Sequence, residues 1–418
     1  MRGVVKFNIE GATRSYTVQS LMIDTMDNSH EMMTVELSDR KINFDDIKSG
    51  TRVSASITAG GIARPFVGYI HHVRAEEDPV TKPTTIICIG ATYLLKEAHQ
   101  RVWSNMTATA IAALVCQDYR LSYNIVPHPR VFPQMSQSGM SDWKFLVYLA
   151  DKIGYNLHPE GASVHMAPRL QSWEEGSKKA LVFNLKKQGT FQSGALIEFE
   201  GIVGENMPTA GGIPANPTTI GVDPRNLELI GSKADKKKST KRISLDTPFN
   251  MINKDHAADS LLEGEYESQA YRERTRYPIK AQARVVGFPS LGPTSPVYLN
   301  GIGPTYSGYW IVSRARHIVD RHGYECILDL CTDSLGNDLE PPTQNIVSIS
   351  PNEVRVSPVT NTLINEQPQL IPGASVPFSD VSKWAGAQSD LRITTPLTEP
   401  VSSLLFNKML VTRGNYGL

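Results

Sequence analysis

The sequence has no excess of charge of either sign. Its 418 residues include 42 Lys or Arg and 42 Asp or Glu, and only 20% of all residues are charged. A protein that binds nucleic acid on its own normally carries a surplus of basic side chains for the phosphates. The balance therefore argues against a freestanding nucleic-acid binder.

Long hydrophobic runs are also missing. Hydrophobic residues make up 40% of the chain but are spread along it, and no apolar stretch approaches the roughly 20 residues of a membrane-spanning helix. The opening residues, MRGVVK, do not form the apolar block of a secretory signal. We expect a soluble protein of roughly two to four domains that folds in a reducing cytoplasm.

Cysteine is scarce. Cys88, Cys116, Cys326 and Cys331 have neither the close paired spacing of a zinc site nor the density of a disulfide scaffold, so we predict that they are small buried hydrophobic residues. The ten histidines never take metal-ligand spacing. Residues 301–306, GIGPTY, begin like a dinucleotide-binding loop but lack the third glycine. The sequence therefore predicts no metal and no cofactor.

The first hundred residues have the alternating pattern of β-strands. The alternation is visible in residues 4–10, 33–37, 53–58, 66–75 and 85–89, with Gly, Asn or Asp between them. Several short antiparallel strands with tight turns favour a barrel or a sandwich.

From about residue 99 the pattern becomes mixed. Thr107 is placed to cap a helix with apolar positions Ile111, Leu114 and Val115. Ser141 is placed to cap a second helix that Gly154 ends, and residues 155–158 and 163–167 predict a small hairpin. Trp143 and the other apolar residues of the second helix are interpreted as core rather than as a ligand pocket.

Strands return at residues 180–185 and 194–200, and again between 279 and 330. Between them, residues 202–247 lose periodicity, and a polar helix interrupted by Gly264 is expected over about 253–274. The remainder, rich in Pro, Ser, Thr and Asn, has too little apolar patterning for a core of its own and predicts an extended arm.

The predicted fold is mainly β with an α+β insertion. It consists of two antiparallel β-barrels, the inserted module and the C-terminal arm. The expected boundaries are 1–98 for the first barrel, 99–175 for the α+β module, 176–335 for the second barrel with an insertion at about 202–275, and 336–418 for the arm.

The two β regions resemble each other near their ends. In the first, a strand ending at Thr58 precedes a glycine turn, a long strand containing Gly68 and an apolar strand at 85–89. In the second, residues 297–299 precede a glycine turn, a long strand that begins near Gly308 and a strand at 324–330. The same order and similar lengths indicate duplicated barrels, although two unrelated hairpins would also give this pattern.

The carboxylates of residues 259–267 lie at helical spacing that could suit a glycosidase. Polar neighbours indicate a solvated helix face instead, whereas a glycosidase needs one desolvated acid and a partner across a cleft. No Gly-x-Ser-x-Gly motif and no convincing Cys-His pairing occur, and His317 is interpreted as a structural partner rather than a general base. We predict no catalytic residues.

One basic run extends from Lys233 to Arg242. A mobile solvated loop is the simpler interpretation, and contact with DNA or an acidic neighbour is the alternative. We expect this loop to lie on the outer wall of any assembly, because a ring of positive charge around a channel would slow the passage of DNA.

Two segments resemble a known family. Residues 140–155, MSDWKFLVYLADKIGY, and residues 301–317, which contain YSGYWIV and end in Arg316 and His317, are similar to baseplate or tail hub proteins of phages. These are called late-control proteins and are related to the hub portion of type VI secretion spike proteins. The resemblance covers roughly residues 1–335.

This resemblance implies a non-catalytic homotrimer around an axial channel. Three chains would present six similar barrels, matching a hexameric tail tube on one side and a trimeric spike on the other. The chain lacks the β-helical repeats of the type VI form, so a separate spike protein is expected. DNA would pass without specific recognition, and the arm could contact baseplate wedge proteins.

The implied location is the virion tail baseplate, after assembly in the bacterial cytoplasm. Two alternatives from other classes stay open at this point. One is a tail-associated cell-wall hydrolase, and the other is a carbohydrate-binding module for host adhesion.

Overall fold

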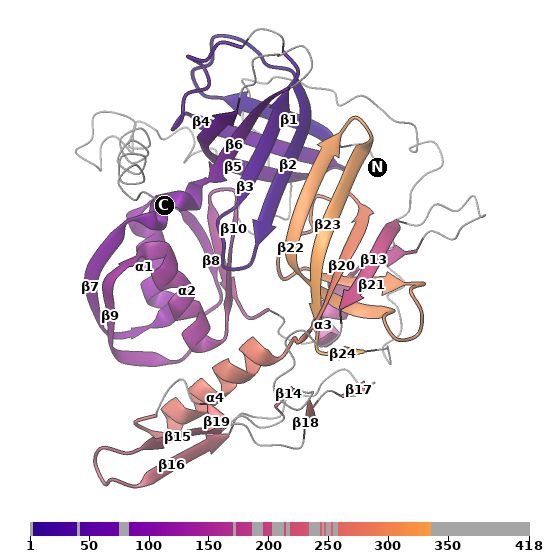
Figure 1. Ribbon diagram of the computed structural model, residues 1–418. Coiled ribbons are helices and arrows are strands. Elements are labelled where there is room, and N and C mark those ends of the chain that lie inside the picture. The colour runs from indigo at the N-terminus through magenta and orange to yellow at the C-terminus, as the bar shows by residue number, and fades with distance from the viewer. Residues whose placement is uncertain are drawn as a thin grey trace, which may run out of the picture.

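The structure is a computed structural model, which describes residues 3–39, 42–74, 83–169, 173–185, 195–202, 213–214, 218–233, 243–244, 246–247, 252–253 and 258–335 (Figure 1). The C-terminal arm, including Leu404, Leu405 and Phe406, therefore lies outside the described residues. So do residues 234–242 of the basic run.

The first half of the β structure has six strands, followed by the short 3-10 helix η1 (Ala91–Lys96). Their order across the sheet is β1-β4-β5-β6-β3-β2, and every pairing is antiparallel. The strands are β1 (Val4–Ile9), β2 (Val18–Met26), β3 (Met32–Leu37), β4 (Arg52–Ala59), β5 (Ile62–Arg74) and β6 (Thr84–Gly90).

The second half repeats this arrangement. Its order is β12-β21-β22-β23-β20-β13, so numbering each half from its own first strand gives the path 1-4-5-6-3-2 twice. The strands are β12 (Leu181–Asn184), β13 (Leu196–Ile202), β20 (Ile279–Val286), β21 (Pro296–Asn300), β22 (Gly308–Asp320) and β23 (Gly323–Thr332). The prediction of a mainly β fold is confirmed.

Two details differ from a pair of closed antiparallel barrels. β12 pairs with β21 in parallel, and an isolated bridge between Leu185 and Leu196 links β12 to β13. In the described part of the first half, no pairing between β1 and β2 occurs. The second half thus closes through one bridge, whereas the described strands of the first half are not joined into a closed ring.

The irregularities of the two halves also correspond. A β-bulge separates Val18 from Ser20 on β2, and another separates Leu196 from Glu198 on β13. On the long strands, bulges follow Ile70 in β5 and Val312 in β22. Because a bulge shifts the pairing register, four bulges at matching places make the two halves equivalent residue by residue.

This register corrects one detail of the sequence comparison. With Ile70 and Val312 equivalent, Gly68 corresponds to Trp310 and not to Gly308. Gly68 is needed for a local reason, since a Cβ there would lie 2.1 Å from the Ile89 carbonyl oxygen on the neighbouring strand. The duplication is therefore carried by topology and bulges rather than by these glycines.

The two halves share one sheet. β2 pairs antiparallel with the second part of β22, from Leu21 opposite Val319 to Met26 opposite Arg314. The result is a continuous path from β1 to β13 (Figure 1). The inward residues of both halves form one hydrophobic cluster, which includes Phe66, Ile70, Trp310 and Leu328.

The inserted module has its own core around two helices. Thr107 accepts a hydrogen bond from the Ala110 amide and Ser141 from the Lys144 amide, so both predicted N-caps are confirmed. Leu114 is exposed, contrary to expectation. The elements are β7 (Ala98–Thr107), α1 (Ala108–Asp118), β8 (Ser122–Ile125), β9 (Val131–Ser141), α2 (Asp142–Ile153), β10 (Asn156–Glu160) and β11 (Ser163–Ala167), followed by α3 (Trp173–Lys179).

The region between β13 and β20 contains one well-defined unit. Strands β15 (Thr218–Val222) and β16 (Leu229–Lys233) form a hairpin against α4 (Leu261–Thr275). The helix begins after Ser260 and continues through Gly264, so the predicted interruption is wrong. Short strands are β14 (Ile213–Pro214), β17 (Ile243–Ser244), β18 (Asp246–Thr247), β19 (Ile252–Asn253) and β24 (Ser334–Leu335).

Among the described residues, no helix has both the length and the apolar character needed to cross a membrane.

Candidate functional site

The most extensive candidate surface is one face of the shared sheet. Eight consecutive strands, from β5 through β6, β3, β2, β22, β23 and β20 to β13, turn alternate side chains away from the core. We name this surface the open face. Its charged side chains are Asp24, Glu36, Glu198, Glu200, Asp320, Glu325 and Asp329 against Arg74, Lys280, Arg284, Arg314 and Arg316.

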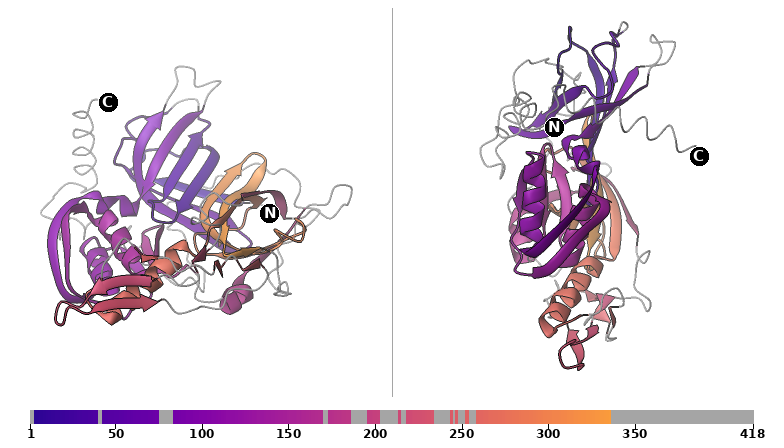
Figure 2. Two further views of the ribbon diagram at one scale, coloured as in Figure 1. Left: turned by 60° about the horizontal axis from the view of Figure 1, so that its bottom comes forward. Right: turned by 90° about the vertical axis from the view of Figure 1, so that its left-hand side faces the viewer.

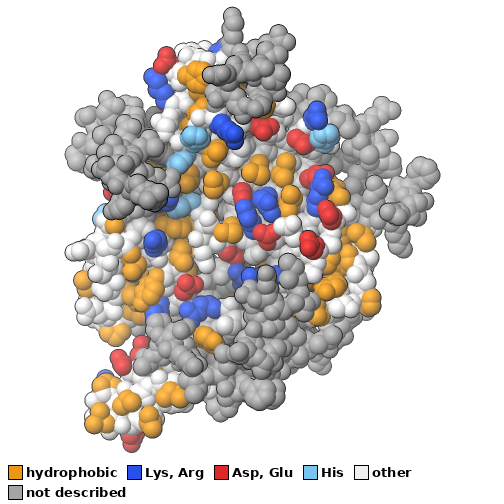
Figure 3. Space-filling view, viewed as in Figure 1, with side chains coloured by type: hydrophobic (Ala, Val, Ile, Leu, Met, Phe, Trp, Pro, Cys, Tyr) orange, Lys and Arg blue, Asp and Glu red, His pale blue; other side chains and the backbone are white. Residues whose placement is uncertain are grey.

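Ion pairs run across the open face where the halves meet. Arg314 on β22 forms a two-pronged pair with Asp24 on β2, in which its Nε donates to Oδ1 at 2.8 Å. Asp329 on β23 lies 3.7 Å from Arg316 and accepts from the Gln282 amide at 2.9 Å. Figure 3 shows basic side chains in blue beside acidic side chains in red near the middle of the molecule. The basic groups on this face are thus largely neutralised by neighbouring carboxylates.

The two ends of this eight-strand path are the second functional feature. β5 pairs with β4 only as far as Tyr69 but with β6 as far as Arg74. In the described part of the chain, the C-terminal end of β5 therefore has a neighbouring strand on one side only. β13 pairs with β20 along one edge, and the isolated bridge at Leu196 is the described pairing on its other edge. The equivalent strands, β22 and β2, pair with each other.

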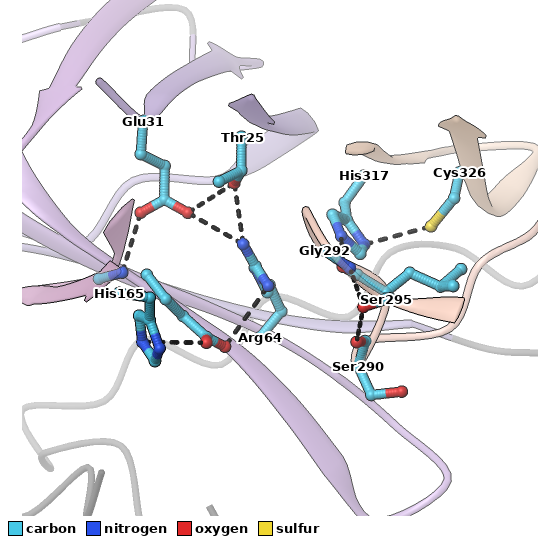
Figure 4. Close-up of polar contacts among 12 residues, drawn as sticks. Thr25, Glu31, Arg64, His165, Ser290, Gly292, Ser295, His317 and Cys326 are labelled. Carbon is cyan, nitrogen blue, oxygen red and sulfur yellow. Dashed lines mark hydrogen bonds and ion pairs between the residues drawn. The ribbon is translucent and has the colours of Figure 1, made fainter. Parts of the chain in front are cut away.

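A buried polar junction joins three parts of the molecule (Figure 4). Arg64 on β5 donates to the Thr25 hydroxyl at 2.9 Å and lies 3.4 Å from carboxylate oxygens of both Glu31 and Glu160. Glu160 belongs to the inserted module. On the side of the second half, a Cβ at Gly292 would lie 2.9 Å from the Arg64 guanidinium. One side chain therefore contacts both halves and the module.

Electrostatics hold Arg64 charged in this junction. Burial acts to lower its pKa, but Glu160 and Glu31 outweigh that effect and raise the pKa. Burial raises the pKa of Glu31 to about 7, although Arg64 and the Thr25 hydroxyl oppose the rise. Both side chains are almost wholly buried, so the junction fixes orientation rather than presenting a reactive group to solvent.

The structure also places a histidine beside a cysteine, which the sequence did not indicate. His317 Nδ1 lies 3.2 Å from Cys326 Sγ and 2.7 Å from the Tyr324 hydroxyl, while its Nε2 lies 2.8 Å from the Leu291 carbonyl oxygen. The carbonyl can only accept, so Nε2 carries the proton and Nδ1 accepts from Tyr324.

This pair lacks the properties of a nucleophile and its base. His317 and Cys326 are both fully buried. Burial raises the pKa of Cys326 to about 12 and lowers the pKa of His317 to about 3, so the thiol stays protonated and the imidazole neutral. A nucleophilic cysteine needs an accessible thiolate. The contacts describe a structural partner for the loop at Leu291.

The acidic cluster of residues 259–267 is only partly solvated. Glu267 is buried, and its Oε1 lies 2.7 Å from Arg130 and 3.3 Å from Lys152 of the module. The prediction of a solvated face is therefore wrong at Glu267, because the helix packs this carboxylate against another part of the chain. The arrangement anchors α4 to the module.

The structure also locates the predicted core tryptophan, the cysteines and the start of the basic run. Trp143 is buried in the module core and its indole nitrogen donates to the Asn28 carbonyl at 3.3 Å. Cys88, Cys116, Cys326 and Cys331 are all buried, as predicted. Lys233 ends β16. Across the part of the chain that the structure describes, no three metal-ligating side chains gather in one place.

No protein-family model matches the sequence, and no curated protein matches it. Solved structures do match. The 43 kDa tail protein of prophage MuSo2 from Shewanella oneidensis is 14% identical, with a TM-score of 0.55 over 80% of this chain and 99% of that one. A tail protein from Neisseria meningitidis MC58 is 13% identical, with a TM-score of 0.58 over 80% and 97%.

A third structure, the c3393 component of the E. coli type VI secretion system, is 10% identical and has a TM-score of 0.49 over 80% of each chain. The two tail proteins cover residues of both halves, because each spans four fifths of this chain. The resemblance to tail and baseplate proteins, first drawn from two short segments, is confirmed at the level of fold.

Proposed function

We propose that this chain is a structural protein of a phage-type tail baseplate and that it forms the hub as a homotrimer. The fold shared with two tail proteins supports the class. Fold alone does not define function, so the finer proposal depends on the geometry of the shared sheet.

One observation carries the proposal of a ring. Within the chain, β2 of the first half pairs with β22 of the second. The equivalents of these strands are β13 and β5, and they stand at the two ends of the eight-strand path. If β13 of one chain pairs with β5 of the next, the contact between chains repeats the contact within a chain. Three chains would then give six similar halves around one axis.

The open face would line the resulting channel. Its basic side chains are offset by nearby carboxylates, as the Arg314 and Arg316 pairs illustrate. Binding of DNA requires unpaired basic groups that displace the counterions of the phosphates. A lined channel of this composition would let DNA pass without holding it, in agreement with the zero net charge of the chain.

The remaining roles follow from this ring. Six similar halves would match a hexameric tail tube or its initiator proteins, and the three-fold axis would seat a separate trimeric spike. Residues 336–418 would contact baseplate wedge proteins, and the protein would assemble in the bacterial cytoplasm and remain in the virion. We further propose the division 1–98, 99–175, 176–335 and 336–418 as the domains of this hub, which acts without catalysis.

The test uses the register of the two halves. Asp24 faces Arg316 across the join within the chain, and their equivalents are Ile202 on β13 and Arg74 on β5. A chain carrying Ile202→Cys and Arg74→Cys should form disulfides between chains and give a trimer on a denaturing gel without reductant. All four native cysteines are buried, so they should not interfere.

Asp24→Cys with Arg316→Cys is the matched control, because this pair should close within one chain. The native mass in solution, with three-fold averaging by electron microscopy, gives an independent measure. A monomer at micromolar concentration that forms no disulfide between chains would overturn the ring.

A further inference from the structure

The hairpin of β15 and β16 with the start of α4 forms a projecting unit, which we name the finger. Figure 1 and the right-hand view of Figure 2 show it extending beyond the inserted module. One face of the hairpin is covered by the chain around α4. Ser268 donates to the Thr219 hydroxyl at 2.8 Å and accepts from its amide at 2.9 Å.

At Gly221, the covered face of the hairpin has no space for a side chain. A Cβ at Gly221 would lie 1.8 Å from the Ala258 carbonyl oxygen, so the backbone before α4 lies directly on the strand. Ile230, opposite Gly221, is buried on the same face. Because side chains alternate along a strand, the neighbours of these residues must point away from α4.

The opposite face is apolar and exposed. Leu229, which pairs with Val222, is 81% exposed, and Leu227 in the connecting turn is 78% exposed. Ile220 and Val222 are also exposed. Leu261 and Leu262, each 58% exposed, belong to α4 and lie outside this face. Single exposed apolar residues are ordinary, but four on one face of a projecting hairpin indicate a contact surface. Figure 3 shows the apolar side chains gathered on this lobe.

Two further properties describe what the finger would bind. β16 is at the edge of the sheet β16-β15-β19, so among the described strands its outer side is available for another strand. The finger is also rich in carboxylates. Asp223 and Glu228 flank Arg225 in the hairpin turn, and Asp259, Glu263 and Glu265 lie at the start of α4, where Glu263 is 3.4 Å from Arg130 of the module. An apolar segment with basic and no acidic residues would complement the finger.

The sequence contains such a segment near its end. Residues 401–413 read VSSLLFNKMLVTR, with seven apolar residues, Lys408 and Arg413, and no carboxylate. The described chain ends at Leu335, and the 65 residues before Val401 would span roughly 200 Å if fully extended. A connection of that length would allow residues 401–413 to reach the finger of the same chain or of a neighbouring chain.

We propose that residues 401–413 of this chain bind the exposed face of the finger, with Leu404, Leu405 and Phe406 covering its leucines and the basic residues meeting its carboxylates. The proposal does not depend on the ring, because the segment and the finger belong to the same polypeptide. It gives the C-terminal arm a specific docking site.

The test is cross-linking in the full-length protein. Leu229→Cys with Leu405→Cys, treated with a short bismaleimide, should cross-link at least tenfold faster than Val102→Cys with Leu405→Cys. Val102 is similarly exposed but lies on β7, outside the finger. Gel mobility separates links within a chain from links between chains, and both support the proposal.

Charge provides the second measurement. Lys408→Glu with Arg413→Glu in the Leu229→Cys, Leu405→Cys protein should slow the cross-link several-fold at low salt. Equal rates at the finger and at Val102 would overturn the proposal. So would links between two fingers through Leu229→Cys alone, which would identify a second finger as the occupant, or an unchanged rate after charge reversal.

Discussion

Arg64 and Glu31 show how a single buried pair can organise three parts of a chain. The pKa of Glu31 is raised to about 7, above its ordinary value of 4.5, because burial disfavours the charged form. An acid whose folded-state pKa is raised binds its proton more tightly in the folded state. Its unfavourable effect on stability therefore grows between pH 4.5 and 7 and is complete above pH 7.

We predict that Glu31→Gln removes this dependence. Relative to the variant, the unaltered protein should lose about 2 kcal/mol of unfolding free energy between pH 5 and pH 8. Urea unfolding of both proteins at the two pH values measures the difference. Asp45→Asn, on an exposed residue, is the control; a pH-independent difference for Glu31→Gln would contradict the assignment.

Cysteine reactivity tests the interpretation of the His317 and Cys326 contact. All four thiols are buried, and burial raises the pKa of Cys88 and of Cys326 beyond the range in which thiolate forms at neutral pH. Native protein at pH 8 should react with less than one equivalent of a thiol reagent over an hour, and denatured protein with four. Rapid labelling of Cys326 alone would indicate a reactive site.

At the scale of residues, the sequence predicted the helix caps, the buried cysteines and the core position of Trp143. It missed the junction around Arg64 and the contact of His317 with Cys326. Both bring together residues from different elements, and Arg64 and Glu160 are 96 positions apart. Glu267 was misjudged for the same reason, because its partners Arg130 and Lys152 are remote in sequence.

Among the elements, the contact of α2 with α4 depends on a glycine. Gly154 ends α2 with a φ of +70°, and a Cβ there would lie 3.0 Å from the Ala270 Cα atom on α4. Gly154→Ala therefore combines left-handed strain with a clash between helices.

A matched control separates these two effects. Gly139 has a φ of +68°, and a Cβ added there would have no atom within 4 Å, so Gly139→Ala should cost about 1 kcal/mol through strain alone. Gly154→Ala should cost at least about 1 kcal/mol more, as measured by urea unfolding. Equal losses would show that the α2 contact tolerates the methyl group.

Element prediction succeeded where periodicity was regular and failed where it was interrupted. Both helices of the module and most strands were found within a few residues. β2 was missed because the bulge between Val18 and Ser20 moves its later apolar residues out of alternation. That strand joins the two halves, so the sequence indicated the duplication but not the connection.

For the whole molecule, the arm can be separated from the ring experimentally. Among the described residues, which end at Leu335, the shared sheet and the inserted module each have a hydrophobic core. Deleting residues 337–418 should leave the unfolding temperature within about 3 °C of the full chain, and it should weaken trimer formation at least tenfold by analytical ultracentrifugation. Unfolding of the truncated chain would contradict this prediction.

The repeated strand order 1-4-5-6-3-2 could not be predicted from the sequence, because pairing between distant strands leaves no local sequence pattern. Only the similarity of the last three strands in each half could be recognised. The residue-level equivalence became visible from the bulges.

The join between β2 and β22 has an evolutionary consequence. Main-chain amides and carbonyls make this joint, and every amino acid except proline supplies both. Side chains along it can be exchanged over generations while the attachment persists. Such tolerance offers a physical reason why proteins that keep only 13% or 14% of the same residues retain a common architecture.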